Sequence, residues 1–357
     1  MNTGIPDRSI QGPAFSYKGG ARGRASLLDS PSGARRSAVT IGNFDGLHRG
    51  HMRLIATLTE RALNLGLPAY VYTFRDHPQN VILGAGAVKL LTDLEKKLEI
   101  LSETGVDGVY AERFDRDFAA LAPEDFVGRE LVGKFGVRLV VVGRGFRFGR
   151  GGCGDVGTLA EYGRRYGFSV EAVSHADVPD AFPDCAGTAG AAGAAGVGGV
   201  SGERKIISSS LVRELISSGK IGEAALLLGR LYSVKGRVIT GADGGADSGC
   251  GKGAAAGCGK SAAALINTFS VPGTACALIY PDIRMAAPAS GLYEAYVRVG
   301  QSLRPCEALV GRNASAPWIR VRALDNTDDL HGAEIEIFFY NRIPDDGYKP
   351  FFKEGFN

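Results

Sequence analysis

Short apolar runs alternate with amphipathic segments from residue 37 to residue 173, and this alternation constrains the possible fold more than any other feature. The apolar runs are rich in β-branched and aromatic residues, and they predict strands at residues 37–41, 69–74, 108–110, 139–143 and 168–173. The amphipathic segments predict helices at residues 51–65, 92–103, 123–135 and 155–166, and a capping box of Thr92 and Glu95 is predicted to open the second of them. This pattern predicts an α/β fold with a parallel sheet covered on both faces, whose ligands bind at the carboxyl ends of the strands.

The pattern changes in the C-terminal part of the chain. Two further helices are predicted at residues 208–217 and 221–228, the first opened by serine. After them, strand-like runs separated by turns occur at residues 232–240, 276–280, 293–299, 318–324 and 333–340. These runs predict a small β-barrel. A chain of 357 residues is long enough for these two domains.

Three segments have compositions that do not support a packed core. Residues 1–36 carry six basic and two acidic side chains among Gly, Ser and Pro, and they predict a disordered extension, with a targeting segment as the alternative. Residues 186–202 contain only Gly, Ala, Val, Ser and Thr, and residues 241–264 are mostly Gly and Ala. Both are predicted to be mobile loops, because so few side chains cannot offset the backbone entropy lost on ordering.

The overall composition excludes several classes of protein. Lys and Arg total 41 against 38 Asp and Glu, so the net charge of +3 argues against a dedicated nucleic-acid binder. No apolar run approaches the roughly 18 residues of a membrane span. The six cysteines form no CxxC pair, and they predict reduced thiols in a cytoplasmic protein.

The strand at residues 37–41 runs directly into the sequence GNFDGLHRGH, which occupies residues 42–51. Its glycines allow the backbone to approach a ligand closely. His48 and His51 flank Gly50 at the start of a helix, where free N–H groups and the helix dipole favour a phosphate. Two imidazoles around a small residue can stabilise the charge that develops on an α-phosphate as pyrophosphate leaves. The alternative is that both histidines merely cap the helix.

This motif resembles the HxGH signature of nucleotidyltransferases. In the form GxFDGxHxGH it is similar to the adenylyltransferase half of the prokaryotic bifunctional riboflavin kinase/FAD synthetases. Other segments resemble motifs of that family in the same order: FRDHP at 74–78, LLT and EK within 90–96, VGRGFRFG at 142–149, ISSSLVR at 207–213 and LGRLYSVKGRV at 228–238. The resemblance implies a Rossmann-like nucleotidyltransferase domain over residues 37–228 and a riboflavin-kinase-like antiparallel β-barrel domain over residues 229–357.

The resemblance also implies roles for individual residues. The implied catalytic residues are His48, His51 and Arg213. The implied ATP-binding residues are Gly42, Phe44, Asp45, Gly46, Gly50, Ser209 and Ser210. The implied flavin-binding residues are Phe74, His77, Pro78, Gly143, Phe146 and Phe148. Core packing of the phenylalanines, a turn at residues 77–78 and a surface role for the arginine are the alternatives. No metal site in the protein is implied, because Mg²⁺ enters with the phosphates of ATP and Asp45 organises the loop.

Several positions depart from the family pattern. Gly145 stands where the family usually has Asp or Asn. The Pro-Thr-Ala-Asn segment that holds nucleotide and Mg²⁺ in the family's kinase half has no counterpart in residues 259–268. Counting back from the DLHG turn at 329–332 places Arg320 at the position of the catalytic Glu. A guanidinium cannot accept a proton at neutral pH, so a degenerate barrel without kinase activity is predicted.

The resemblance therefore implies an FMN adenylyltransferase that makes FAD and pyrophosphate from ATP and FMN, with Mg²⁺. ATP and FMN are the expected partners, without nucleic acid or membrane, and the barrel is a possible surface for homo-oligomers. Three alternatives stay open. They are a fully bifunctional enzyme, an HxGH transferase acting on another acceptor, and a flavin- or nucleotide-binding sensor without turnover.

Overall fold

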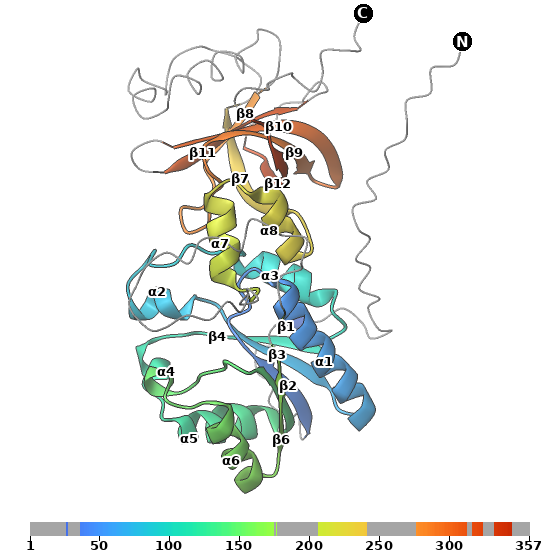
Figure 1. The fold of residues 1–357 in the computed structure, drawn as a ribbon, viewed down its shortest axis with the longest axis vertical. Helices are drawn as coiled ribbons and strands as arrows, with labels where there is room; N and C mark the ends of the chain where they lie inside the picture. The colour runs from blue at the N-terminus through green and yellow to red at the C-terminus, as the bar shows by residue number, and fades with distance from the viewer. Residues whose placement is uncertain are drawn as a thin grey trace, which may run out of the picture.

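A six-stranded parallel β-sheet lies at the centre of the N-terminal half (Figure 1). This computed structural model describes residues 26–27, 36–174, 176, 206–240, 276–312, 316–323 and 332–344. The strands are β1 (Ser26–Leu27), β2 (Ser37–Ile41), β3 (Ala69–Phe74), β4 (Gly108–Glu112), β5 (Val137–Gly143) and β6 (Ser169–Val173). Their order is β1-β4-β3-β2-β5-β6 and all neighbours run parallel, which confirms the predicted α/β fold.

Helices cover both faces of this sheet, because successive side chains of a strand point to opposite sides. On one face Ala38 shares a core with Leu58 of helix α1. On the other face Val39 shares a core with Leu131 and Leu159. The helices of this half are α1 (Arg49–Leu65), α2 (Pro78–Ile82), α3 (Leu94–Ser102), α4 (Arg116–Ala119), α5 (Pro123–Asp125), the π-helix η1 (Phe126–Lys134), the 3₁₀-helix η2 (Arg150–Gly152) and α6 (Val156–Tyr166).

The strand order reverses beside β2, which has β3 on one side and β5 on the other. At such a switch point the connections leave towards opposite faces, and ligands bind in the crevice at the carboxyl ends of the strands. The loop that follows β2 contains the histidine motif. The topology therefore places this motif where a parallel sheet of this kind binds its ligands.

The C-terminal half is a closed antiparallel barrel with the strand order β10-β11-β8-β7-β12-β9. Its strands are β7 (Tyr232–Thr240), β8 (Cys276–Ile279), β9 (Gly291–Val299), β10 (Ser302–Arg312), β11 (Pro317–Ala323) and β12 (Glu334–Arg342). The predicted barrel is confirmed, although β10 was not foreseen because Pro305 and its charged neighbours disguise the strand. Strand β11 pairs with β10 only from Cys306 onward, so Pro305 needs no ladder partner on that side.

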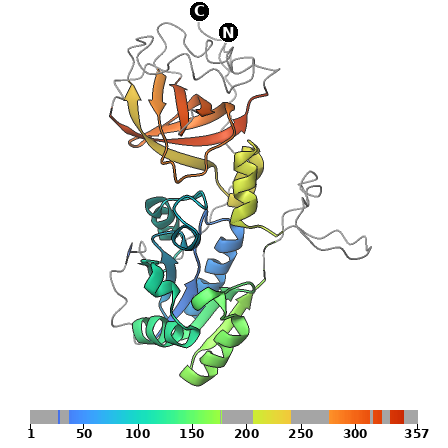
Figure 2. The same cartoon turned by 90° about the vertical axis from the view of Figure 1, so that its left-hand side faces the viewer.

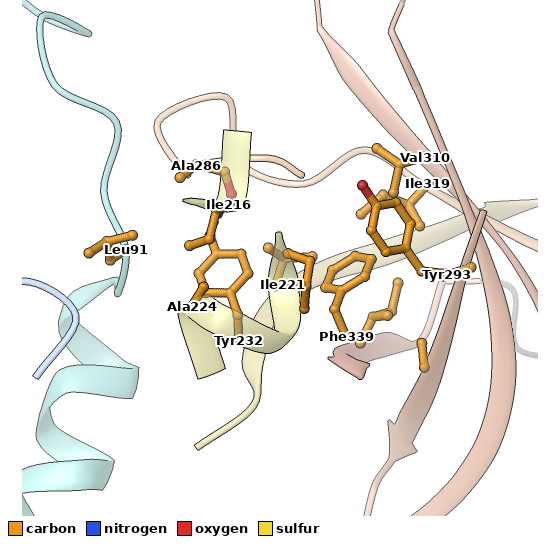
Figure 3. Packing of buried hydrophobic residues seen from close by; sticks show 14 of the residues in the cluster. Leu91, Ile216, Ile221, Ala224, Tyr232, Ala286, Tyr293, Val310, Ile319 and Phe339 are labelled. Atoms are coloured by element: carbon orange, nitrogen blue, oxygen red, sulfur yellow. Dashed lines mark hydrogen bonds between the residues drawn. The ribbon is translucent and has the colours of Figure 1, made fainter. Parts of the chain in front are cut away.

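Helices α7 (Ser209–Ser217) and α8 (Ile221–Leu228) lie between the sheet and the barrel (Figure 2). They share one hydrophobic core with the barrel, and Leu91 of the N-terminal half joins that core at its edge (Figure 3). Within this core the rings of Tyr293 and Phe339 contact each other edge to face, with their centroids 5.4 Å apart. The two helices that follow the sheet are therefore packed as part of the barrel.

Some of the low-complexity predictions lie outside the described residues, including both Gly/Ala-rich loops at 186–202 and 241–264. The N-terminal prediction was wrong at one point. Ser26–Leu27, within the predicted disordered extension 1–36, form β1 and pair with Gly108 and Val109 of β4. Pairing with the edge strand β4 gives these two residues backbone hydrogen-bond partners that composition cannot predict.

The predicted helix at 123–135 is present, but most of it is wound as the π-helix η1. Gly128 and Gly133 lie within it and weaken the preference for α-helical winding. The buried carboxylate of Glu130 accepts from the Tyr72 hydroxyl at 2.8 Å and pairs with Lys134 at 2.5 Å. This network stabilises the unusual winding against the sheet.

The capping box predicted at Thr92 and Glu95 was wrong. Helix α3 is capped by Asp93, whose carboxylate accepts from the Lys96 N–H at 2.6 Å. The Thr92 hydroxyl is used elsewhere, because it accepts from the Gly46 N–H at 3.1 Å. A long-range contact has therefore displaced the local one.

Substitutions distinguish the Asp93 cap from the capping box of Thr92 and Glu95. We expect Asp93→Ala to lower the free energy of unfolding by about 1 kcal/mol, because a helix N–H loses its acceptor. Glu95→Ala should change it by less than about 0.5 kcal/mol, because Glu95 is 76% exposed and only pairs with Lys235. Urea unfolding of both variants measures the difference. A larger loss of stability in Glu95→Ala than in Asp93→Ala would instead support the capping box.

Candidate active site

The loop between β2 and α1 has an unusual backbone conformation. Phe44, Gly46 and Leu47 have φ angles of 49°, 79° and 44°, in the left-handed region that non-glycine residues seldom adopt. The side chains of Phe44 and Leu47 are 1% and 0% exposed. Their burial compensates for the strain, so the core holds the loop in one conformation.

Asp45 is the centre of this loop. Its buried carboxylate accepts from the Leu91 N–H at 2.9 Å and the Thr92 N–H at 3.1 Å, and it pairs with the Arg213 guanidinium at 2.6 Å. The Asp45 carbonyl also accepts from the Ser209 hydroxyl at 2.8 Å. The carboxylate is thus committed to the protein, as expected for a residue that organises the loop.

His48 and His51 stack against each other at the start of α1. Their ring centroids are 3.7 Å apart with an interplanar angle of 16°. His48 is the N-cap of the helix, and its Nδ1 accepts from the His51 N–H at 3.4 Å. A neutral His48 therefore carries its proton on Nε2. The rings of Phe44 and His51 lie edge to face with their centroids 5.3 Å apart, so Phe44 supports the pair from one side.

Glycines make room for this arrangement. A Cβ atom on Gly50 would lie 3.1 Å from the His48 ring. A Cβ atom on Gly42 would lie 3.0 Å from the Phe44 ring, and one on Gly46 would lie 2.7 Å from Leu91. The three glycines of the motif are therefore required by close packing around the loop.

Both histidines are neutral at pH 7. The pKa of His48 is lowered to about 4, mainly by burial; the Asp45 charge opposes this shift and the Arg230 charge adds to it. Burial also lowers the pKa of His51, with His48 and Lys97 adding to the effect. Within the described part of the chain, the buried Nδ1 of His51 has no hydrogen-bond partner. In the tautomer that carries its proton on Nδ1, this nitrogen is an unused hydrogen-bond donor at the start of a helix.

Two cations of this site were missed by the sequence analysis. The buried Lys97 ammonium donates to the carbonyls of Asn43 at 2.8 Å and Phe74 at 3.2 Å, and burial lowers its pKa to about 8. Arg230 donates to the Gly46 carbonyl at 2.6 Å. Lys97 lies on the apolar stripe of α3, which was a usable signal. Arg230 comes from the segment before β7, and no local pattern indicates its contact.

The remaining residues predicted to bind the nucleotide lie beside this loop. Ser209 and Ser210 begin α7, with Ser208 as N-cap, and Arg213 follows one turn later. Arg213 also lies 3.5 Å from Nε2 of His77, the N-cap of α2. The structure therefore brings together residues from three of the predicted motifs.

The predicted flavin residues lie at the same edge of the sheet, after β3 and β5. Phe146 and Phe148 stack with centroids 5.6 Å apart, but Phe148 is only 6% exposed and contacts Phe126 within the core. The ring of Phe74 contacts that of Phe114 edge to face, with their centroids 5.2 Å apart. Pro78 is the first residue of α2, and Gly143 is the last residue of β5. Of the stacked pair, Phe146 is the ring that remains accessible to a ligand.

The comparisons with known proteins agree with this geometry. A family model described as FAD synthetase matches residues 30–181. The bifunctional riboflavin kinase/FMN adenylyltransferase of Escherichia coli (strain K12) is 32% identical over 327 residues, which cover 90% of this chain and 88% of that protein. The protein of the same description from Bacillus subtilis (strain 168) is 28% identical over 309 residues, or 86% and 84% of the two chains.

A solved structure described as a macrolide-efflux protein from Streptococcus pneumoniae has a TM-score of 0.68, covering 92% of this chain and 93% of that one. Its sequence identity is 20%, so this likeness shows the fold alone.

A parallel sheet with a histidine pair at its switch point, followed by a closed barrel, defines a two-domain protein of the HxGH nucleotidyltransferase class. The extent of the match to the Escherichia coli protein then identifies the family. The chain belongs to the bifunctional riboflavin kinase/FMN adenylyltransferase family. The resemblance seen in the motifs is confirmed.

None of the described helices is long and apolar enough to cross a membrane. Within the same parts of the chain, no group of three or more His, Cys, Asp or Glu side chains is arranged to hold a metal ion.

The close packing at Gly50 yields a test. We expect Gly50→Ala to reduce FAD formation by about tenfold to a hundredfold, because the new methyl group displaces the His48 ring by a fraction of an ångström. Gly222→Ala in α8 is the matched control, because a Cβ atom there meets open space. Rates at saturating substrates measure the effect. Equal rates for the two variants would contradict the packing argument.

The low histidine pKa values have a consequence for stability. Between pH 6.5 and 4 the unfolded chain protonates His48 while the folded chain does not, so stability falls as the pH falls through this range. We expect His48→Gln to reduce this slope by about 1 kcal/mol per pH unit. Urea unfolding at several pH values measures it. A slope identical to that of the wild type would show that His48 titrates normally.

Proposed function

We propose that this chain transfers the adenylyl group of ATP to the phosphate of FMN. An FMN phosphate oxygen attacks the α-phosphorus, the bond to the β-phosphate oxygen breaks, and pyrophosphate leaves. The observation that carries the proposal is the stacked histidine pair at the start of α1, with the buried Nδ1 of His51 unpaired within the described residues. Membership of the family supports the same reaction.

The histidines act through position. His48 is neutral, and it donates its Nε2–H to a non-bridging oxygen of the α-phosphate. His51 supplies the second hydrogen bond from the same side. Charge builds up on these oxygens in the transition state, so donors already aimed at them stabilise it without reorganising. Gly42, Phe44, Gly46 and Gly50 shape the loop around the nucleotide.

Other cations complete the electrostatics. Arg213, one turn into α7, neutralises the departing pyrophosphate together with the hydroxyl groups of Ser209 and Ser210. Mg²⁺ enters with ATP, bound to its phosphates. Asp45 does not hold this ion, because its carboxylate is occupied by backbone N–H groups and Arg213.

The flavin ring lies against the loops that follow β3 and β5. Phe146 stacks on the isoalloxazine, and Phe148 supports Phe146 from the core. His77 and Pro78 line the opposite side, Phe74 backs this wall, and Gly143 lets the backbone approach. Gly145 is exposed and offers no side chain to the ligand, so binding there relies on the backbone.

The barrel has lost riboflavin kinase activity in this proposal. Arg320 lies on β11 between Leu309 of β10 and Leu278 of β8, where no proton acceptor replaces the family's Glu. The expected departure at residues 259–268 and most of the DLHG turn that served as the counting reference lie outside the described residues. ATP and FMN are the proposed partners, the cytoplasm is the proposed location, and the barrel is the proposed surface for homo-oligomers. Nucleic acid and membranes are not among the proposed partners.

The domain division also stands as part of the proposal. We place the boundary between residues 228 and 229, with residues 37–228 as the transferase and 229–357 as the barrel. Helix α7 belongs to the first by its proposed site residues, and both α7 and α8 belong to the second by their packing.

An end-point assay tests the function. Protein freed of flavin is incubated with ATP, Mg²⁺ and either riboflavin or FMN, and the products are separated by chromatography. We expect FAD from FMN and neither FMN nor FAD from riboflavin. Products from riboflavin would show a bifunctional enzyme and contradict the argument from Arg320.

Alanine variants distinguish an enzyme from a sensor. His48→Ala and His51→Ala should each reduce FAD formation by about a hundredfold or more while FMN affinity changes by less than about threefold. Loss of affinity without any turnover in the wild type would favour a flavin-binding sensor.

A further inference from the structure

Helix α3 contacts both halves of the chain, and it presents a different kind of side chain to each. Leu101 and its apolar neighbours on the helix pack into the core of the sheet. The side chains that face the barrel are charged: Glu95 pairs with Lys235 at 2.8 Å, and Glu99 lies 3.6 Å from the guanidinium of Arg298. The contact between α3 and the barrel is therefore made by ion pairs.

Glu336 of β12 is the centre of this contact. Its carboxylate is 4% exposed, accepts from the Ser233 hydroxyl at 2.5 Å and pairs with the Lys96 ammonium of α3 at 3.0 Å. The Arg298 guanidinium donates to the same carboxylate. Both cations also lie over the Phe338 ring, 5.4 and 5.3 Å from its centroid. A carboxylate buried this far is tolerated because these partners replace its hydration.

A cavity of about 270 Å³ lies beside this ion cluster, and Thr92, Lys96, Ser233 and Glu336 are among the residues that line it. Side chains do not fill this space, so close packing does not set the separation between the start of α3 and the barrel here. The Leu90 N–H donates to a barrel carbonyl at 2.7 Å and anchors the segment before the helix. The ion pairs of Glu336 hold the helix itself.

The residue that follows Lys96 on α3 contacts the histidine loop. Successive side chains of an α-helix point about 100° apart, so Lys97 is directed away from the barrel when Lys96 is directed towards it. The Lys97 ammonium donates to the Asn43 carbonyl at 2.8 Å and to the Phe74 carbonyl at 3.2 Å. One turn of one helix therefore joins the barrel to the loop that carries the histidines.

We propose that Glu336 is a positioning residue for adenylyl transfer, which acts through Lys96 and α3 on the contact between Lys97 and the histidine loop. The proposal rests on the proposed function. Without the carboxylate, Lys96 and Arg298 repel each other across the Phe338 ring and displace α3. Glu99 also pairs with both cations, but it is 39% exposed and compensates only weakly.

Steady-state kinetics of Glu336→Gln test the proposal. We expect kcat for FAD formation to fall about tenfold, because a displaced loop no longer aims its donors at the transition state. KM for FMN and for ATP should change less than about threefold, because the ligands still bind. Rates are expressed per protein molecule that binds FMN. Glu334→Gln, an exposed position on the same strand, is the matched control and should equal the wild type. Equal kcat values for Glu336→Gln and Glu334→Gln overturn the proposal.

The imidazole ¹⁵N signals supply a readout that a loss of global stability does not move. The chain has only five histidines, so the signals of His48 and His51 can be assigned by substitution. We expect both signals to shift in folded Glu336→Gln and to stay in place in Glu334→Gln. Unchanged signals in Glu336→Gln overturn the proposal as well.

A second pair of variants guards against misfolding. Lys96→Gln removes the link from the side of α3 and leaves Glu336 with Ser233 and Arg298, and we expect the same fall in kcat and the same shifts. Lys235→Gln is its matched control, because this lysine also joins the barrel to α3 but its partner is 76% exposed. Wild-type behaviour of Lys96→Gln contradicts the proposal.

The two readouts separate this proposal from the proposed function. A wild type that makes no FAD, with histidine signals that shift in Glu336→Gln and Lys96→Gln, refutes the proposed function and leaves the link between the barrel and the histidine loop in place. A wild type that makes FAD, with rates and signals unchanged in both variants, refutes the positioning role alone.

Discussion

The structure depends on one buried carboxylate. Asp45 is 3% exposed, and a charge buried to this extent is tolerated only when hydrogen bonds and an opposite charge replace its hydration. The Leu91 and Thr92 N–H groups and the Arg213 guanidinium meet this requirement. Since these partners come from the segment before α3 and from α7, satisfying Asp45 fixes the histidine loop relative to that segment and to α7.

Burial and charge have separate roles around the histidine pair. Stacked imidazoles 3.7 Å apart could not both be protonated without strong repulsion, and burial keeps them neutral. Positive charge is supplied instead by groups held behind the loop. Lys97 and Arg230 donate to loop carbonyls, so they stiffen the backbone and contribute positive potential together. The combination of neutral imidazole donors with the fixed cations Lys97 and Arg230 suits an anionic transition state.

Sequence patterns predicted the helices and strands whose signal lies in neighbouring residues. The strand at Tyr232–Thr240 and the helix at Ile221–Leu228 were predicted with their observed bounds, because their apolar spacing and flanking residues suffice. What failed depends on contacts distant in sequence. Thr92 looked like a cap but bonds to Gly46, and β1 exists only through its pairing with β4. Arg230 reaches the loop across 184 positions, so no window of sequence could reveal its contact with Gly46.

The packing of the barrel explains why its fold would be kept under the proposed loss of kinase activity. Its core is formed by one face of each strand, such as Ile319 and Val321 on β11, while Arg320 lies on the other face between them. Replacing a catalytic carboxylate at that position leaves the core untouched. The core itself cannot be dispensed with, because α7 and α8 pack into it and α7 carries Ser209 and Arg213. Loss of the barrel would expose the apolar faces of these helices and release the arginine from Asp45. Under the proposed loss of kinase activity, selection for adenylyl transfer alone is therefore sufficient to retain the barrel.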